Sequence, residues 1–429
     1  MTFDLLIENA AFPDGRKGQS LGISAGKIIA IAPALPVEAA RVIDAAGCLV
    51  APPFVDCHFH MDATLSLGQP RMNVSGTLLE GIALWGELRA TLTHEAVAER
   101  ALRYCDLAVA QGLLAVRSHV DITDNRLVAV EALLQVKKDV APYLDLQLVA
   151  FPQDGYYRCA QAAKNLERAL DLGVDVVGGI PHFERTMAEG LASVTALSEI
   201  AAKRGLRLDL HCDETDDPNS RHIEALAAQA HRLGLGARAV GSHLTSMHSM
   251  DNYYVSKLLP LIAQSGIQTI ANPLINITLQ GRHDTYPRRR GLMRIAEMRA
   301  HGIPVALGQD CVMDPWYGLG NADMLDVASM AVHGAPMTSR EAIAWSFEAV
   351  TTHAARVMGL ENYGLAPGCN ADLVLLQAAD PIEAVRLRAQ RLLVVRRGKI
   401  IAQASRRQTR LLLPGRPEII DAMDYAPKT

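Results

Sequence analysis

Residues 55–64 read VDCHFHMDAT, and they continue a largely apolar run that begins at Leu49. An apolar run without polar alternation is typical of a strand buried on both faces of a parallel sheet. Residues i and i+2 of a strand point to the same side, so the imidazoles of His58 and His60 can reach one metal ion. We therefore expect a buried strand over residues 49–57 that carries a pair of ligands at its carboxyl end.

Further apolar runs follow this first strand and alternate with amphipathic stretches such as residues 93–111, 124–139 and 220–233. The predicted strands cover residues 49–57, 113–120, 144–151, 174–180, 207–210, 237–241, 267–271 and 303–307. Eight buried strands separated by helices are typical of one α/β architecture, the (β/α)8 TIM-like barrel. A doubly wound sheet is the alternative.

The two ends of the chain have a different pattern. Short β-like runs punctuated by Gly and Pro occupy residues 5–8, 20–23, 27–31, 41–43, 371–376 and 391–402, with Gly398-Lys399 as a hairpin turn in the last. We expect a small β-sandwich-like domain built from both termini, residues 1–50 and 365–413. The barrel then spans residues 51–364, and residues 414–429 form a C-terminal arm.

Composition excludes several classes of protein. The chain has 429 residues, a formal net charge of −4 and no apolar run of about 18 residues, so we expect neither a membrane span nor a basic nucleic-acid-binding surface. Seven cysteines without a Cys-x-x-Cys pair are typical of reduced thiols and indicate a cytoplasmic protein. Fourteen histidines are the feature to explain, because histidine is the commonest metal ligand.

Side chains that bind metals or move protons stand at the carboxyl ends of several predicted strands. They are His58, His60, His211, Glu214, His243 and Asp310. These strand ends converge in a closed barrel, so all six side chains can meet although the chain separates them widely. Each histidine alone is more often a core or loop residue, and only their coincidence at strands one, five, six and eight favours a metal site.

The types of donor indicate a catalytic site and not a structural one. Three imidazoles and one carboxylate leave a coordination position open for water, and a divalent ion lowers the pKa of that water from about 15.7 to about 7. Glu214 is placed to shuttle protons, while His243 and Asp310 hold and deprotonate the water. The alternative for Glu214 is a surface carboxylate at a helix N-terminus, among acidic neighbours.

The chain resembles the amidohydrolase superfamily and, within it, the cytosine deaminase branch. The resemblance runs through nearly the whole chain, in segments such as VDCHFHMDAT, GQPRMNVSGTLLEG, VRSHVD, VAFPQDG, HCDETDD, GSHLTSMHS, ANPLINITLQGR and DPWYGLG. It implies metal ligation by His58, His60, His211 and Asp310, proton transfer by Glu214, and contact of His243 with the attacking hydroxide. It also implies substrate contacts at Leu78, Gln153, Cys311 and Trp316, where the amide of Gln153 pairs with the N1/O2 edge of a pyrimidine.

The resemblance also bears on the number of metal ions. Binuclear members of the superfamily bridge two metals with a modified lysine after strand four, where this chain has Ile180-Pro181-His182-Phe183. We therefore expect one divalent ion per subunit, Fe2+ or Zn2+, since this ligand set permits either. A homo-oligomer and a free nucleobase as the small-molecule partner, without nucleic acid or membrane, are further expectations.

One position departs from the pattern of the branch. Where the branch usually has His-Asp-Asp after strand eight, this chain has Gln309-Asp310-Cys311, which replaces a carboxylate near the C5 edge of the base with a small uncharged thiol. Cys311 is either a packing residue without consequence or opens room for a 5-substituent. The second alternative predicts that hydroxide on the metal attacks C4 of both cytosine and 5-methylcytosine, which yields uracil or thymine plus ammonia.

Two other functions are compatible with the sequence. Hydrolysis of an s-triazine, as in N-isopropylammelide amidohydrolases, uses the same metal and proton shuttle, and Gln153 favours the pyrimidine over it. A noncatalytic barrel that serves as a scaffold belongs to another class. Such relics usually lose ligands, whereas all six positions are filled here.

Overall fold

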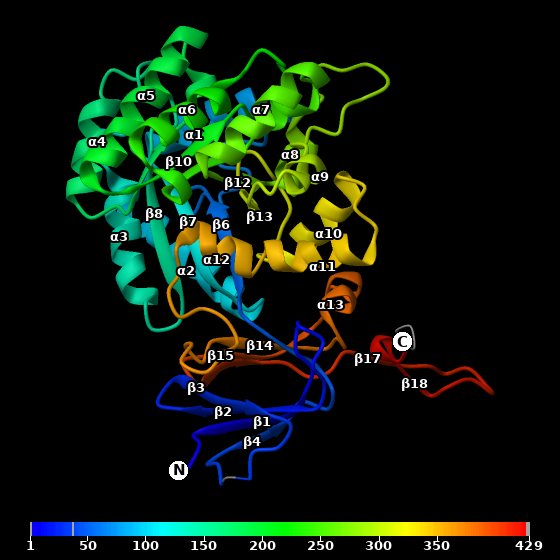
Figure 1. The fold of residues 1–429 in the computed structure, drawn as a ribbon. Helices are drawn as coiled ribbons and strands as arrows, with labels where there is room; N and C mark the ends of the chain where they lie inside the picture. Colours follow the sequence, from blue (N-terminus) through cyan, green and yellow to red (C-terminus); the bar gives the residue numbers. More distant parts are fainter. Residues whose placement is uncertain (1, 37, 426–429) are drawn as a thin grey trace.

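Eight parallel strands form the centre of the fold and follow one another in chain order (Figure 1). The computed structural model describes residues 2–36 and 38–425. The strands are β6 (Phe54–Phe59), β7 (Leu113–Asp121), β8 (Asp145–Phe151), β9 (Val176–Gly179), β10 (Arg207–Cys212), β11 (Ala239–His243), β12 (Gln268–Ala271) and β13 (Val305–Leu307). A parallel bridge between Phe59 and Asp310 joins the last strand to the first. The predicted (β/α)8 barrel is confirmed, and the doubly wound sheet is wrong.

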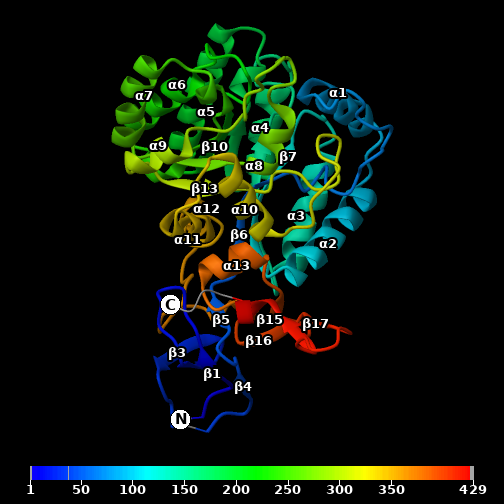
Figure 2. The ribbon, with the colours of Figure 1, turned by 90° about the vertical axis from the view of Figure 1, so that its right-hand side faces the viewer.

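Helices lie between these strands in the chain and also follow the last of them, and most pack around the barrel (Figures 1 and 2). They are α1 (Leu78–Arg89), α2 (His94–Ala110), α3 (Val128–Val140), α4 (Ala162–Asp171), α5 (Met187–Arg204), α6 (His222–Leu233), α7 (Asn252–Ser265), α8 (Pro273–Leu279), α9 (Ile295–Ala300), α10 (Met324–Gly334), α11 (Arg340–Ala349), α12 (Thr352–Met358) and α13 (Pro381–Leu387). Thr93 and Thr186 accept hydrogen bonds from the first turns of α2 and α5, and Gly205 and Gly234 end α5 and α6 in the left-handed conformation. None of the described helices is long and apolar enough to span a membrane.

The prediction of one strand over residues 49–57 was wrong. The run divides at Pro52-Pro53 into β5 (Leu49–Ala51) and β6. Neither proline has a backbone N–H to donate to a sheet, so the run cannot continue as one hydrogen-bonded strand. β5 pairs with β14 (Leu373–Leu376) outside the barrel, and β6 enters the barrel from that side. The carboxyl end of β6, which carries His58, therefore lies on the barrel face away from the terminal sheets.

Two four-stranded sheets from the ends of the chain lie together below the barrel (Figures 1 and 2). One contains β1 (Leu5–Ala10), β2 (Gln19–Ser24), β3 (Lys27–Ala32) and β4 (Val42–Asp44), and the other contains β5, β14, β15 (Arg391–Arg396) and β16 (Lys399–Gln403). Ile7 and Leu21 of the first sheet share a buried apolar cluster with Leu373 and Val395 of the second. The predicted sheet structure from both termini is confirmed, while the exact domain boundaries stay a prediction.

The last described residues form a hairpin beside the second sheet. β17 (Gln408–Arg410) pairs with β18 (Ile419–Asp421), and a short 3-10 turn, η4 (Ala422–Tyr425), follows. The predicted arm over residues 414–429 therefore begins in this hairpin, and residues 426–429 lie outside the described part of the chain.

Candidate metal centre and active site

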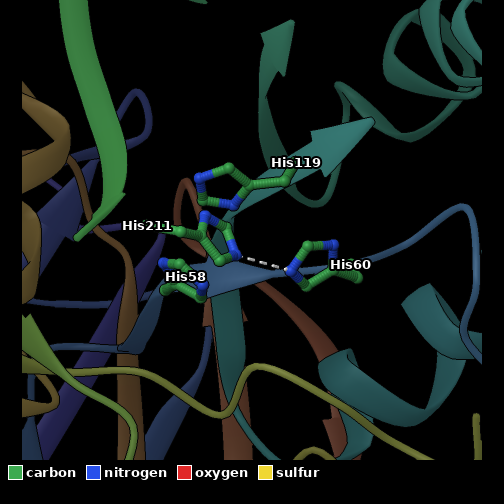
Figure 3. Close-up of side chains that lie close together, drawn as sticks. All are labelled: His58, His60, His119 and His211. Atoms are coloured by element: carbon green, nitrogen blue, oxygen red, sulfur yellow. Dashed lines mark hydrogen bonds between the residues drawn. The ribbon is translucent and has the colours of Figure 1, made fainter. Parts of the chain in front are cut away.

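The predicted ligands converge at the carboxyl ends of the barrel strands. The Nε2 atoms of His60 and His211 lie 3.1 Å apart, and Asp310 Oδ1 lies 3.3 Å from His60 Nε2 and 3.5 Å from His58 Nε2. His58 is the penultimate residue of β6, His60 follows that strand, and His211 belongs to β10. Figure 3 shows the rings of His58, His60 and His211 turned toward one another. All the predicted ligands are buried.

The donor set suits a divalent cation. Burial lowers the pKa of His58, His60 and His211 well below the ordinary histidine value, so the imidazoles are neutral, as ligands must be. Among the described residues, His58 Nδ1 and His211 Nδ1 have no hydrogen-bond partner although both are buried. Imidazole with carboxylate is a donor combination that iron and zinc accept. The residues present therefore fit one such ion.

His119 joins this cluster and was not among the predicted site residues. It lies in β7, its ring centroid is 4.3 Å from that of His58, and neither ring nitrogen has a hydrogen-bond partner within the described chain. Ligand atoms of His58, His60, His119 and His211 all lie within 4.8 Å of one another, as do those of His58, His211, His243 and Asp310. His119 lies near the carboxyl end of the predicted strand over residues 113–120. The search for metal-binding side chains at strand ends could therefore have identified it.

Several strand ends have an unusual backbone conformation. Asp213, His243 and Asp310 have φ values of +57°, +71° and +68°, in the left-handed region that few residues other than glycine adopt. Each such residue costs on the order of 1–3 kcal/mol unless its surroundings enforce the conformation. At Asp310 the backbone N–H donates to the His58 carbonyl at 2.8 Å and the carbonyl accepts from His60 N–H at 3.0 Å. These two hydrogen bonds hold the left-handed Asp310 backbone against His58 and His60.

Glu214 and His243 form a buried pair beside the metal cluster. Glu214 Oε1 lies 3.3 Å from His243 Nδ1, and both side chains are buried. Burial raises the pKa of Glu214 to about 8. The alternative of a surface carboxylate is therefore wrong. Two amides that sequence reasoning missed, Asn272 and Asn276, contact the His243 ring, with Asn276 Nδ2 2.9 Å from Nδ1.

A cavity opens next to this pair and contains every predicted substrate contact. Its lining consists of His60, Leu78, Gln153, Ile180, His211, Glu214, Ile275, Leu279, Asp310, Cys311 and Trp316. Apolar side chains form most of the wall, and Gln153 presents a side-chain amide. The lining therefore combines apolar walls with one amide beside the metal cluster.

The loop after β13 forms one wall of this cavity. Asp314 Oδ1 accepts hydrogen bonds from the backbone N–H groups of Trp316 and Tyr317, both at 2.9 Å. Trp316 packs directly on Gly81 of α1, where an added Cβ would lie 2.3 Å from the Trp316 ring. Burial, with smaller contributions from Asp310 and Asp314, raises the pKa of the Cys311 thiol well above its usual range. Cys311 is thus a neutral thiol at the cavity wall.

His182 follows β9, in the segment where binuclear members of the superfamily carry the modified lysine. Its Nδ1 lies 2.9 Å from the His211 carbonyl oxygen, so it holds the backbone of a predicted ligand. Its Nε2 is buried and has no hydrogen-bond partner among the described residues.

Comparison with known proteins agrees with this geometry. A sequence profile described as the amidohydrolase family matches residues 41–402. The crystal structure of 5-methylcytosine deaminase from Klebsiella pneumoniae, liganded with 5-fluorocytosine, is 42% identical, with a TM-score of 0.92 and coverage of 95% of this chain and 99% of that chain.

Two further relatives act on another substrate class. N-isopropylammelide isopropyl amidohydrolase of Pseudomonas sp. (strain ADP) is 28% identical over 94% of this chain and 98% of its own length. The structure of N-isopropylammelide isopropylaminohydrolase from Burkholderia multivorans is 27% identical, with a TM-score of 0.81 and coverage of 93% and 98%.

Proposed function

The chain belongs to the amidohydrolase family, and we propose that it hydrolyses the exocyclic amino group of free pyrimidine bases, cytosine and 5-methylcytosine. It is a metal-dependent aminohydrolase, so the scaffold alternative is wrong. In the proposed reaction the oxygen of water adds to C4, the C4–N4 bond breaks, and N4 leaves as ammonia. Uracil or thymine is the product.

The side chains of the cavity support separate parts of this reaction. A divalent ion held by His58, His60, His211 and Asp310 would supply a Lewis acid and lower the pKa of water from about 15.7 toward 7. Glu214 carries its proton at neutral pH because burial raises its pKa to about 8, so it can donate to a ring nitrogen. The resulting carboxylate then takes a proton from the hydroxyl added at C4 and passes it to the departing amine. His243, held by Asn276, orients the attacking water.

We propose that the other side chains that line the cavity bind the base. The Gln153 amide offers a donor and an acceptor side by side, which matches the N1/O2 edge of a pyrimidine. Leu78 and Trp316 pack against the ring. The observation that carries the proposal is that Gln153, Glu214 and Cys311 line one buried cavity beside the metal cluster.

Cys311 is proposed to set the preference for the 5-methyl group. The buried thiol is neutral, so a methyl group can rest against it without removing water from a charge. A carboxylate in its place would have to lose hydration when the methyl group binds. A methyl group in a fitting pocket changes kcat/KM by roughly 10–200-fold.

The substitution Cys311→Asp tests this preference. We expect the ratio of kcat/KM for 5-methylcytosine to that for cytosine to fall at least about tenfold. Cys311→Ser, which is uncharged and of similar size, is the matched control and should keep most of the ratio. An unchanged ratio in Cys311→Asp would show that Cys311 is a packing residue.

A second candidate function is supported by the two triazine-acting relatives. It predicts that N-isopropylammelide is hydrolysed with a higher kcat/KM than either pyrimidine. A panel of cytosine, 5-methylcytosine, isoguanine, creatinine, ammelide and N-isopropylammelide, with the products separated by chromatography, distinguishes the two functions. Turnover of N-isopropylammelide alone would overturn the pyrimidine assignment.

The cofactor and assembly are proposed in the same terms. Metal analysis of the purified protein should find one iron or zinc ion per chain, because the two groups of donors described overlap at His58 and His211. The homo-oligomer and the cytoplasmic location stay predictions, and light scattering tests the first.

A further inference from the structure

We propose that Asp213 is a positioning residue that holds Glu214 and His243 beside each other. The inference rests on the proposed function, because it concerns the two side chains assigned to proton transfer and water orientation. Asp213 precedes Glu214 directly and is completely buried. Neither its carboxylate nor its carbonyl lines the cavity, so it acts through its neighbours.

The Asp213 carboxylate joins the end of β10 to the first turn of α6. Oδ1 accepts hydrogen bonds from Ser220 Oγ at 2.7 Å, from His222 N–H at 2.9 Å and from His222 Nδ1 at 2.8 Å. Oδ2 accepts from Ile223 N–H at 2.9 Å. Both oxygens therefore accept hydrogen bonds, and charge-assisted hydrogen bonds of this kind are among the strongest in proteins.

The Asp213 carbonyl makes a second connection, to the segment after β11. It accepts hydrogen bonds from Ser246 N–H at 3.0 Å and from Thr245 Oγ at 3.1 Å. Thr245 begins the 3-10 turn η3 (Thr245–His248), only two residues after His243. One residue thus fixes both the turn that precedes Glu214 and the turn that follows His243.

This double connection explains the strained backbone at the same place. Asp213 has a φ of +57°, and His243 and Leu244 have φ values of +71° and +51°. Left-handed residues persist where surrounding contacts enforce them. The two turns face each other and set the 3.3 Å separation between Glu214 Oε1 and His243 Nδ1. If the contacts of Asp213 are weakened, this separation should increase.

The substitution Asp213→Asn tests the inference with little change to the backbone preference. Asparagine adopts the left-handed conformation about as readily as aspartate, but it loses one acceptor and the negative charge. We expect kcat for the preferred base to fall about 10–100-fold, because small displacements of reacting groups are costly. KM should change less than about threefold, because the substrate contacts are intact, and the metal content should equal that of the parent.

Asp217→Asn is the matched control, since Asp217 is exposed in the same acidic segment and its carboxylate accepts only a local hydrogen bond, from Asn219 N–H, among the described contacts. Ser220→Ala removes the hydroxyl that donates to the Asp213 carboxylate, and Thr245→Val removes the hydroxyl that contacts the carbonyls of Asp213 and Thr215. Each should give a smaller loss of kcat. These two variants carry the test if Asp213→Asn does not fold. A kcat equal to that of the control in all three variants would overturn the inference, as would a parallel loss of metal.

A crystallographic measurement separates this inference from the proposed function. In crystal structures of the parent and of the variants, the distance from Glu214 Oε1 to His243 Nδ1 should increase from 3.3 Å to beyond hydrogen-bonding reach in Asp213→Asn or Thr245→Val. An unchanged distance overturns the role of Asp213, whichever substrate the parent accepts. Failure of the parent to deaminate either pyrimidine overturns the proposed function alone.

Discussion

Glu214 belongs to a cluster of four acidic residues, and its surroundings alone distinguish it from the others. Asp213 is buried and its carboxylate accepts hydrogen bonds from α6, whereas Glu214 lines the cavity. Asp216 and Asp217 are in contact with solvent. Composition cannot separate these four environments, because each depends on which segments of the barrel meet at that point. The chemical role of a carboxylate therefore follows from its desolvation and its partners.

The raised pKa of Glu214 predicts the pH dependence of turnover. The group must be protonated to donate, and its pKa is about 8, so the donor is present at neutral pH and lost as pH rises through 8. We expect kcat to decline above about pH 8, and Glu214→Gln to lower kcat roughly 10²–10⁴-fold at pH 7. A pH–rate profile checks both. A kcat that stays constant to pH 10 would contradict the assignment.

The raised pKa of Asp314 predicts that the stability of the folded protein depends on pH. Burial raises its pKa to about 6 from an ordinary value of 3.8, so the folded state favours the protonated form. Its contribution to stability is fully present below pH 3.8 and is lost as pH rises through about 6. The variant Asp314→Asn keeps a side-chain oxygen that can accept from the backbone N–H groups of Trp316 and Tyr317. Its side chain does not titrate, so it lacks this pH dependence.

Urea unfolding of the parent and of Asp314→Asn from pH 4 to pH 7 measures this effect. The parent should lose roughly 2 kcal/mol of unfolding free energy relative to the variant over that range. Parallel stability curves would show that Asp314 does not titrate as expected.

At the scale of elements, the packing of α1 against Trp316 leaves no room for a methyl group at Gly81. An added Cβ at Gly81 would lie 2.3 Å from the Trp316 ring, so Gly81→Ala should displace this cavity wall. We expect kcat/KM to fall at least about tenfold, mainly through KM. Gly86→Ala on the same helix is the control, because nothing lies within 4 Å of its added Cβ. It should keep activity and stabilise α1 by about 1 kcal/mol.

Much of the barrel could be predicted from the sequence, because its strands are short apolar runs between amphipathic helices. Seven of the eight predicted strand ranges each overlap one observed barrel strand. The first predicted range is divided at Pro52-Pro53 into two strands. The apolar run did not reveal this division, because the residues on both sides of the prolines are buried and apolar alike. The meeting of His58, His211 and Asp310 followed from barrel closure.

The supporting residues could not be predicted in the same way. Asn276 contacts His243 from α8, and Asp213 binds α6 and η3 through a left-handed turn. Neither connection leaves a periodic signal in the sequence. Side chains that hold other side chains depend on tertiary packing, and their residue types are common in ordinary loops.

At the scale of the whole molecule, the metal centre joins distant strands. His58 lies in β6 and His60 directly follows it, His211 lies in β10, and Asp310 follows β13. Removal of the ion by a chelator should lower the thermal unfolding temperature, because a ligand at about 1,000 times its Kd stabilises the fold by about 4 kcal/mol. Calorimetry before and after metal readdition measures the effect. Asp310→Asn should show a smaller metal-dependent shift, and an equal shift would contradict its role as a ligand.

The pairing of β5 with β14 has a consequence for biosynthesis. Ala51 leaves the ribosome about 320 residues before Val374, its partner in the sheet. At about 5–20 residues per second, the apolar edge of β5 stays without that partner for tens of seconds, while the barrel strands emerge. Nascent chains stalled before residue 373 should therefore expose Leu49 and Val50 and recruit chaperones, whereas chains that have released β14 and β15 should not.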